Sequence, residues 1–337
     1  MTTAAAPAAS KHWPASLYRR PDGGLELDLS PIRMREILES GDGELWVDID
    51  STNMHQQALL EKVFQFHPLA IEDTFSPGSR VKLEEYDRYI FVVASGLRFD
   101  RATPDPFDLE TFNLYFFLGK NFLVTVHAIA SPSCDSTRER LMRNPDLLGR
   151  GAEMTMHAII DQAVDAYFPV VEQLNELVDS LEERLFEAFD ERLIHEIFKA
   201  KRSAFAFRRH IGPLREVLNV LTNRPSVYIR TETQLYYRDV YDHTIRIMES
   251  VDATRDLLAG VLETYLSQMS NRMNKVMKQL SIVATIALPM IVVGGIYGMN
   301  FAHLPLTADP IGFYWALGSM FAVSGAMLWW LRKNRWL

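Results

Sequence analysis

Cysteine is almost absent from this chain of 337 residues. Cys134 is the only one, so one chain can form neither an internal disulfide nor a cysteine-based zinc cluster. We expect a lone buried thiol, which fits a reducing compartment. Residues 1–10 lack the basic region and apolar core of a signal peptide. They predict a disordered lead-in, followed by a domain that stays in the compartment where it is made.

Motifs for enzyme chemistry are missing as well. The sequence has no G-x-x-x-x-G-K-[ST] phosphate loop, G-x-S-x-G elbow, H-E-x-x-H helix or EF-hand loop. Its nine histidines include no pair four residues apart, so we expect His67, His127 and His157 to be structural or surface side chains. We predict neither an enzyme, a nucleotide cofactor nor a nucleic acid partner. Plentiful Asp, Glu and Asn oxygens favour hard cations such as Mg²⁺.

Charge is nearly absent from the C-terminal part. Asp309 is the only charged residue among the 53 residues from 279 to 331, whereas the other 284 residues hold 77 of the 78 charged side chains. The mean hydropathy of the whole chain lies near zero because it averages these two unlike parts. The distribution predicts a charged soluble body joined to a membrane module.

Two apolar segments of this module are long enough to cross a membrane, which takes about 20 helical residues. They are residues 280–299 and 311–331, with 20 and 21 residues. The connecting loop, 300–310, has no Lys or Arg, whereas basic residues precede the first segment and form the tail 332–337. The positive-inside rule therefore places both termini in the cytoplasm. A buried helical hairpin in a soluble core is the alternative.

The N-terminal part, residues 11–150, mixes short strands and helices. Alternating residues 44–50 and the β-branched and aromatic run 89–97 predict strands, and residues 54–64 have helical spacing. Two further apolar runs, 112–118 and 122–127, flank Gly119 as in a hairpin. This pattern predicts an α/β domain within a mixed α+β chain.

A helical hairpin with divided charge is expected at 151–225. The net charge is −9 over residues 161–196 and +7 over residues 197–230. Acidic residues at spacings of three, four or seven form an acidic stripe, made of Asp161, Asp165, Glu172, Glu176, Asp179, Glu183 and Glu187. Two interpretations are open: a face that attracts or senses cations, or an acidic helix paired with its basic antiparallel neighbour.

The helical pattern resumes near Gln234 and meets no proline before Pro289. A cytoplasmic stalk helix, 226–279, would then continue into the first membrane helix, 280–299. Such a helix, about 100 Å long, must pack against neighbours, and a homo-oligomeric bundle supplies them.

One face of this long helix is polar in its lower half and apolar or small in its upper half. This stalk stripe consists of Ser267, Asn271, Asn274, Lys278, Ser281, Thr285, Leu288, Val292, Gly295 and Met299. Polar side chains inside a membrane are costly unless they face water or another helix. Around a symmetry axis the stripe would line a pore that narrows at Leu288. Ordinary packing of small and polar helix residues is the alternative.

Tyr297-Gly298-Met299-Asn300, with a second span close behind, resembles the CorA family of divalent-cation channels. Segments 160–168, 213–218, 237–243, 270–278 and 333–337 resemble the family too. The resemblance covers nearly everything after about residue 30. It implies a funnel-shaped homopentamer in the cell membrane, with a cytoplasmic α/β domain, a pore helix and an outer second membrane helix.

The resemblance also implies roles for particular residues. The selectivity filter falls on Gly298, Met299 and Asn300. Pore-lining positions fall on Asn274, Leu280 and Leu288, beside Ser281 and Thr285 of the stalk stripe, with Glu263 lower in the pore. Metal-sensing carboxylates at subunit contacts fall on Glu72, Asp73, Asp161 and Asp239. Cytosolic Mg²⁺ bound there would hold the closed state.

The implied function is passive influx of Mg²⁺, or of Co²⁺ or Ni²⁺, driven by the membrane potential. One departure is that residues 301–306 lack the glutamate found in the magnesium branch, which leaves Asp309 as the loop's only acid. A zinc transporter of the same family, with or without proton coupling, is one alternative. A membrane-anchored sensor or scaffold that conducts nothing is the other, and the polar Ser281 and Thr285 argue against it.

Overall fold

The computed structural model describes residues 14–76, 78–99, 109–187, 190–300, 305, 311–334 and 336. The chain divides into two compact units. The first comprises Met1–Arg184 and Arg192–Ala259, and the second comprises Leu185–Glu191 and Gly260–Leu337. The expected lead-in, 1–10, and most of the loop 300–310, with Asp309, lie outside the described residues.

A seven-stranded mixed sheet forms the centre of the first unit. Its strands are β1 (Ala15–Arg19), β2 (Leu25–Leu27), β3 (Glu44–Asp50), β4 (Lys82–Tyr86), β5 (Tyr89–Phe99), β6 (Leu109–Leu118) and β7 (Phe122–His127), in the spatial order β2-β1-β3-β7-β6-β5-β4. β3 and β7 run parallel, whereas the other neighbours are antiparallel. The predicted hairpin around Gly119 is confirmed, since β6 pairs with β7.

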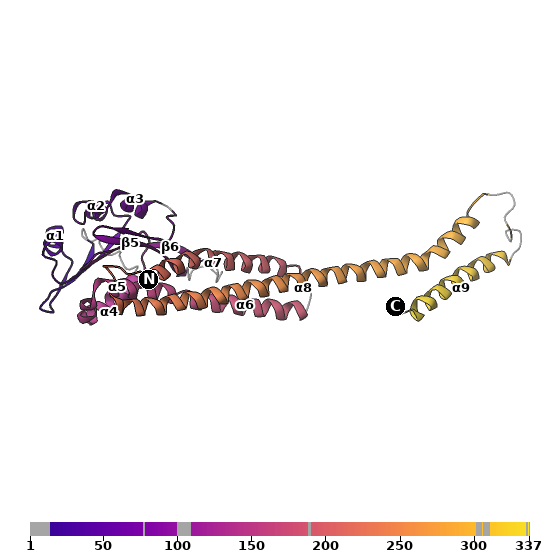
Figure 1. Ribbon diagram of the computed structural model, residues 1–337. Coiled ribbons are helices and arrows are strands. Elements are labelled where there is room, and N and C mark those ends of the chain that lie inside the picture. The colour runs from indigo at the N-terminus through magenta and orange to yellow at the C-terminus, as the bar shows by residue number, and fades with distance from the viewer. Residues whose placement is uncertain are drawn as a thin grey trace, which may run out of the picture. The chain divides into compact units, whose positions relative to one another are not determined.

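Helices cover both faces of the sheet, because alternate strand residues are buried on each side. One face carries α1 (Pro31–Ser40), α2 (Met54–Lys62) and α3 (Pro68–Phe75) (Figure 1). Met34, Leu60 and Phe66 of this side join Val47 and Phe117 of the sheet in one apolar core. The other face carries α4 (Pro132–Arg143), the 3-10 helix η1 (Pro145–Arg150) and α5 (Ala152–Asp165). The predicted α/β fold is confirmed.

Three long helices follow: α6 (Phe168–Glu187), α7 (Leu193–Asn223) and α8 (Thr231–Tyr297). α8 is one continuous helix of 67 residues and begins three residues before the expected Gln234. In the first unit it buries a residue every three or four positions, namely Tyr237, Val240, Thr244, Ile247, Val251, Thr254 and Leu258. Thr254 donates a hydrogen bond to Asn175 of α6 (2.5 Å), and Asp252 pairs with Arg208 of α7. These contacts hold the three helices together.

Charge pairing between α6 and α7 differs from the expectation. The ion pair that joins them runs from Arg184, a basic residue of the acidic helix, to Glu196, at 2.6 and 3.0 Å. In the described part of the chain no ion pair connects the acidic stripe to the basic helix at four exposed positions, which are Glu172, Glu176, Asp179 and Glu183. The pairing interpretation is wrong for these four, because their side chains point to solvent rather than toward α7.

The second unit contains the end of α8 and α9 (Gly312–Lys333). The hydroxyl of Ser324 on α9 donates to the Ile286 carbonyl at 3.0 Å, and Ile282 and Leu331 are buried. Among the described residues, α8 is the one helix long and apolar enough to cross a membrane by length and composition. α9 has 22 residues and is not among the helices that meet this criterion. The second span stays a prediction.

Candidate functional site

The stalk stripe lies on a side of α8 that α9 leaves uncovered. The side facing α9 carries the buried Ile282 and, one turn later, Ile286, whose carbonyl accepts the Ser324 bond. Each helical residue turns the chain by about 100°, so Ser281 and Leu288 are centred roughly 100° around the helix from that side. Ser281 is exposed, Thr285 is half-buried, and Leu288 is 56% exposed. In the described part of this unit, α9 therefore leaves Ser281 and Leu288 of the stripe exposed.

The stripe continues downward along α8. Asn274 lies seven residues before Ser281, which is about two turns, and Glu263 lies 18 residues before it, or five turns. Because both separations are close to whole turns, the two side chains share the face of Ser281. Both are also exposed. Leu280, next to this face, is 70% exposed. The predicted pore residues from 263 to 288 thus lie along one side of α8, with Leu280 at its margin.

Gly298, Met299 and Asn300 follow directly on the last residue of α8, Tyr297. The amide of Gly298 still donates to the Gly294 carbonyl at 3.0 Å. A Cβ placed on Gly298 would lie 3.0 Å from that same oxygen, so glycine allows the close approach that ends the helix here. Asn300 follows two residues after Gly298 and is exposed.

The predicted sensor residues Glu72 and Asp73 lie on α3 beside further acidic residues. The ammonium group of Lys82 lies 2.7 Å from the carboxylates of both Asp73 and Glu84. Together with Glu85 these side chains line a hollow of about 610 Å³. Sequence reasoning missed the partners on β4, although the charged run beginning at Lys82 was a visible signal. A divalent ion binding here would compete with the lysine.

Asp161 and Asp239 lie in another cluster, between α5 and α8. His243 joins it: its Nδ1 lies 3.5 Å from Asp165 and its Nε2 lies 3.7 Å from Asp239. Ligand atoms of Asp161, Asp165 and His243 all lie within 4.8 Å of one another. Burial raises the pKa of Asp161, because desolvation disfavours the charged form of the carboxyl group. The spacing of four residues between Asp239 and His243 was the sequence signal for the missed histidine.

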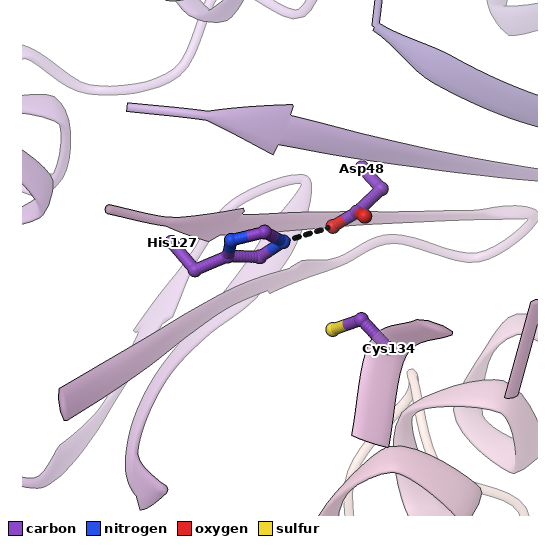
Figure 2. Close-up of side chains that lie close together, drawn as sticks. All are labelled: Asp48, His127 and Cys134. Atoms are coloured by element: carbon purple, nitrogen blue, oxygen red, sulfur yellow. Dashed lines mark hydrogen bonds and ion pairs between the residues drawn. The ribbon is translucent and has the colours of Figure 1, made fainter. Parts of the chain in front are cut away.

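Imidazole and carboxylate groups also meet on the α4 side of the sheet, where His127 points toward Asp48 (Figure 2). The Asp48 carboxylate accepts hydrogen bonds from His127 (3.0 Å) and Thr125 (2.5 Å) and pairs with Arg138. Burial opposes its charge, yet these partners lower the pKa of Asp48. Burial raises the pKa of the nearby Cys134 thiol, which keeps it protonated.

Asp48, His127 and Cys134 therefore form an internal network rather than a metal site, because the Arg138 guanidinium already neutralises the carboxylate. The structural role expected for His127 is confirmed, and so is the buried free thiol of Cys134.

Residues 41–333 match the family described as CorA-like Mg²⁺ transporter protein, and the chain belongs to this family of divalent-cation transporters. It is 36% identical over 290 residues to YfjQ of Bacillus subtilis, covering 86% of this chain and 89% of YfjQ. It is 34% identical over 296 residues to the cobalt/magnesium transport protein CorA of Thermotoga maritima, covering 87% and 83%.

The fold is also that of solved structures. The CorA magnesium transporter from Methanocaldococcus jannaschii superposes with a TM-score of 0.81 at 20% identity, over 96% of this chain and 98% of that one.

The zinc transport protein ZntB of Pectobacterium carotovorum is a more distant relative by sequence. It is 21% identical over 174 residues, covering 50% of this chain and 53% of ZntB.

Proposed function

We propose that this chain assembles into a homopentameric membrane channel that carries Mg²⁺ into the cytoplasm, with Co²⁺ and Ni²⁺ as further substrates. One observation carries the proposal: Gly298-Met299-Asn300 follows directly on an apolar helix whose stalk stripe is left uncovered by α9. Five such helices around an axis bring five stripes to a central pathway and five Asn300 amides to its outer end.

Exposed apolar side chains on α8 support the oligomer. Just below the apolar segment, Met269, Met273, Val276 and Met277 are 45–61% exposed. Such a row is unfavourable in water unless other helices cover it. Neighbouring copies of α8 would bury these residues and stabilise a helix too long to stand alone.

The pathway separates selection from gating. Mg²⁺ loses its hydration water reluctantly, so the neutral amides of Asn300 would select the hydrated ion through hydrogen bonds to its water. Leu288 would form the apolar constriction, and Ser281 and Thr285 would keep the pathway wet below it. An inside-negative potential contributes about 4.6 kcal/mol per 100 mV for a divalent ion, which is sufficient for uptake without nucleotide hydrolysis.

The carboxylate clusters would report cytoplasmic Mg²⁺ to this gate. Glu72 and Asp73 from one copy, with Asp161 and Asp239 from its neighbour, repel each other across a subunit contact unless a divalent ion bridges them. Bound Mg²⁺ would hold the symmetric closed ring, and loss of the ion would shift the population toward open states.

A zinc transporter is the second candidate. The partial match to ZntB favours it, as does the imidazole of His243 beside Asp165 and Asp239, because imidazole suits Zn²⁺ better than Mg²⁺. Zinc uptake with proton coupling and zinc uptake without it are both versions of this candidate.

Flux into liposomes tests both candidates. Purified protein is reconstituted, and uptake of Mg²⁺, Co²⁺, Ni²⁺ and Zn²⁺ is followed under an inside-negative potential, with and without a pH gradient. We expect Mg²⁺ uptake that is lost in Asn300→Ala and kept in the control Asn223→Ala, whose exposed amide contacts Asn219. Zinc uptake that depends on the pH gradient would favour the second candidate. No flux of any metal would leave a membrane-anchored sensor or scaffold.

A further inference from the structure

A large cavity in the first unit is lined by none of the carboxylates of the clusters described above. It has a volume of about 1070 Å³ and lies between α3, the strands β5 and β6, and α7. Sites for small molecules commonly occupy 300–1000 Å³. The cavity is therefore large enough for a ligand of mononucleotide size.

The charged residues among the described lining of the cavity are all basic. Arg80 and Arg209 line it, and none of the described residues around it is Asp or Glu. Neither arginine has an ion pair within the described part of the chain, whereas Arg208, the next residue on α7, pairs with Asp252. In a chain with a net charge of −8, two unneutralised guanidinium groups at one cavity favour an anionic occupant.

The floor of the cavity is polar and fixed. His210 contacts the Ser95 hydroxyl through Nδ1 and the Thr111 hydroxyl through Nε2, both at 3.3 Å. Burial, together with the charge of Arg209, lowers the pKa of His210, which favours the neutral ring. The two hydroxyl contacts fix the orientation of the ring. Asn113, opposite Ser95 in the sheet, adds an amide to the same wall.

Aromatic residues complete the lining. Phe75 and Phe112 lie on the cavity wall, and their rings offer apolar surface to a planar heterocycle. Guanidinium groups match phosphate oxygens in bidentate geometry. The wall thus combines an apolar surface on which a planar ring can pack with guanidinium groups that can bind a phosphate.

We propose that this cavity binds a phosphorylated organic metabolite of mononucleotide size, with its phosphate on Arg80 and Arg209 and its organic part against Phe75 and Phe112. No glycine-rich phosphate loop is required, because side chains rather than backbone amides make the contacts. None of the cavity's described lining residues is among those of the proposed ion pathway.

Equilibrium binding to the full-length protein in detergent tests the proposal. Isothermal titration in metal-free buffer would use AMP, ATP and inorganic phosphate as separate probes, so that ion flux plays no part in the result. We expect AMP or ATP to bind and inorganic phosphate to bind at least about tenfold more weakly. Arg80→Gln and Arg209→Gln should each weaken nucleotide binding about tenfold or more.

Arg208→Gln is the matched control, because it removes the same charge one residue away on α7. Its affinity should equal that of the unmodified protein. Absence of AMP and ATP binding at millimolar concentrations would overturn the proposal. An equal loss in Arg208→Gln would overturn it as well, since attraction to net charge would then explain the binding. Inorganic phosphate binding as tightly as AMP would contradict the organic part of the proposed site.

Discussion

The two halves of α8 differ in what covers them. Between Thr231 and Tyr265 the helix buries a residue at every turn against its own chain, whereas none of the residues from 266 to 281 is buried. The lower half is therefore completed within one chain. The upper half has an apolar and polar surface that one chain leaves open, and this is the surface that the proposed oligomer would cover.

The largest effect should come from charging the open half. Met273→Asp would place one carboxylate per copy in the proposed bundle, where like charges repel at close range. We expect the pentamer to dissociate, as measured by native mass spectrometry in detergent. Met142→Asp on α4, at a methionine of comparable exposure (45% against 55%), should leave the mass unchanged. Equal behaviour of the two variants would contradict the distinction between open and completed surface.

A buried ion pair provides the next largest effect, now in the completed unit. Asp48→Asn leaves Arg138 and His127 without their counter-charge, which should cost about 3–5 kcal/mol of unfolding free energy. Urea titration followed by tryptophan fluorescence, to which the buried Trp46 beside Arg138 contributes, would measure the loss. Asp146→Asn breaks an exposed pair with Arg19, and its effect should stay below about 1 kcal/mol. A similar decrease in unfolding free energy in both variants would contradict the prediction that burial makes the Asp48 ion pair the more important of the two.

The pH dependence of the same unit tests a buried acid. Burial, with the nearby Glu153, raises the pKa of Glu44 to about 7, although the Ala152 amide donates to its carboxylate. A raised folded-state pKa means that the native protein holds the proton more tightly, so this group's contribution to stability is full below its unfolded pKa of about 4.5 and declines as pH rises to about 7.

Glu44→Gln should therefore raise the free energy of unfolding by about 1–3 kcal/mol at pH 8 and leave it unchanged near pH 4. Thermal melts across this range would show the difference. Glu39→Gln, at an exposed position of α1, serves as the control and should shift neither end. A gain at pH 4 as large as that at pH 8 would argue against titration of Glu44.

The smallest effect concerns the contact between α8 and α9. Pro289 supplies no amide to the Thr285 carbonyl, and the Ser324 hydroxyl donates to the adjacent carbonyl, of Ile286. Ser324→Ala should cost about 0.6 kcal/mol, measured by thermal stability in detergent. Ser319→Ala should cost less, because its hydroxyl bonds within its own helix to Ala316. The reverse order would mean that the bond between the helices contributes nothing.

Local pattern was sufficient for much of this protein. Alternation predicted β3, helical spacing predicted α2, and Gly119 marked the hairpin between β6 and β7. These features depend on residues that are close in sequence, so the amino-acid sequence alone is sufficient to predict them. The stalk stripe follows the same logic, because helix periodicity places residues three, four or seven apart on one face. The positions assigned to the filter come instead from the resemblance of residues 297–300 to the CorA family.

Contacts between segments far apart in the chain could not be predicted from the sequence. The parallel pairing of β3 with β7 brings Asp48 to Thr125 and His127, about 80 residues away, and no local pattern indicates it. The charge of α6 and α7 suggested pairing, but four residues of the acidic stripe, Glu172, Glu176, Asp179 and Glu183, are exposed to solvent, because packing of apolar residues decides the rotation of each helix.

The sequence by itself thus determined the elements, the apolar helix and the family, because periodicity and short motifs are local properties of a chain. Tertiary structure alone decided which charges are neutralised, as for Lys82 beside Asp73 and Arg138 beside Asp48. It also decided which arginines line a cavity beside α7 without a carboxylate among its described lining residues. Electrostatic interactions act across space rather than along the sequence, so only the folded chain shows which groups are near enough to interact.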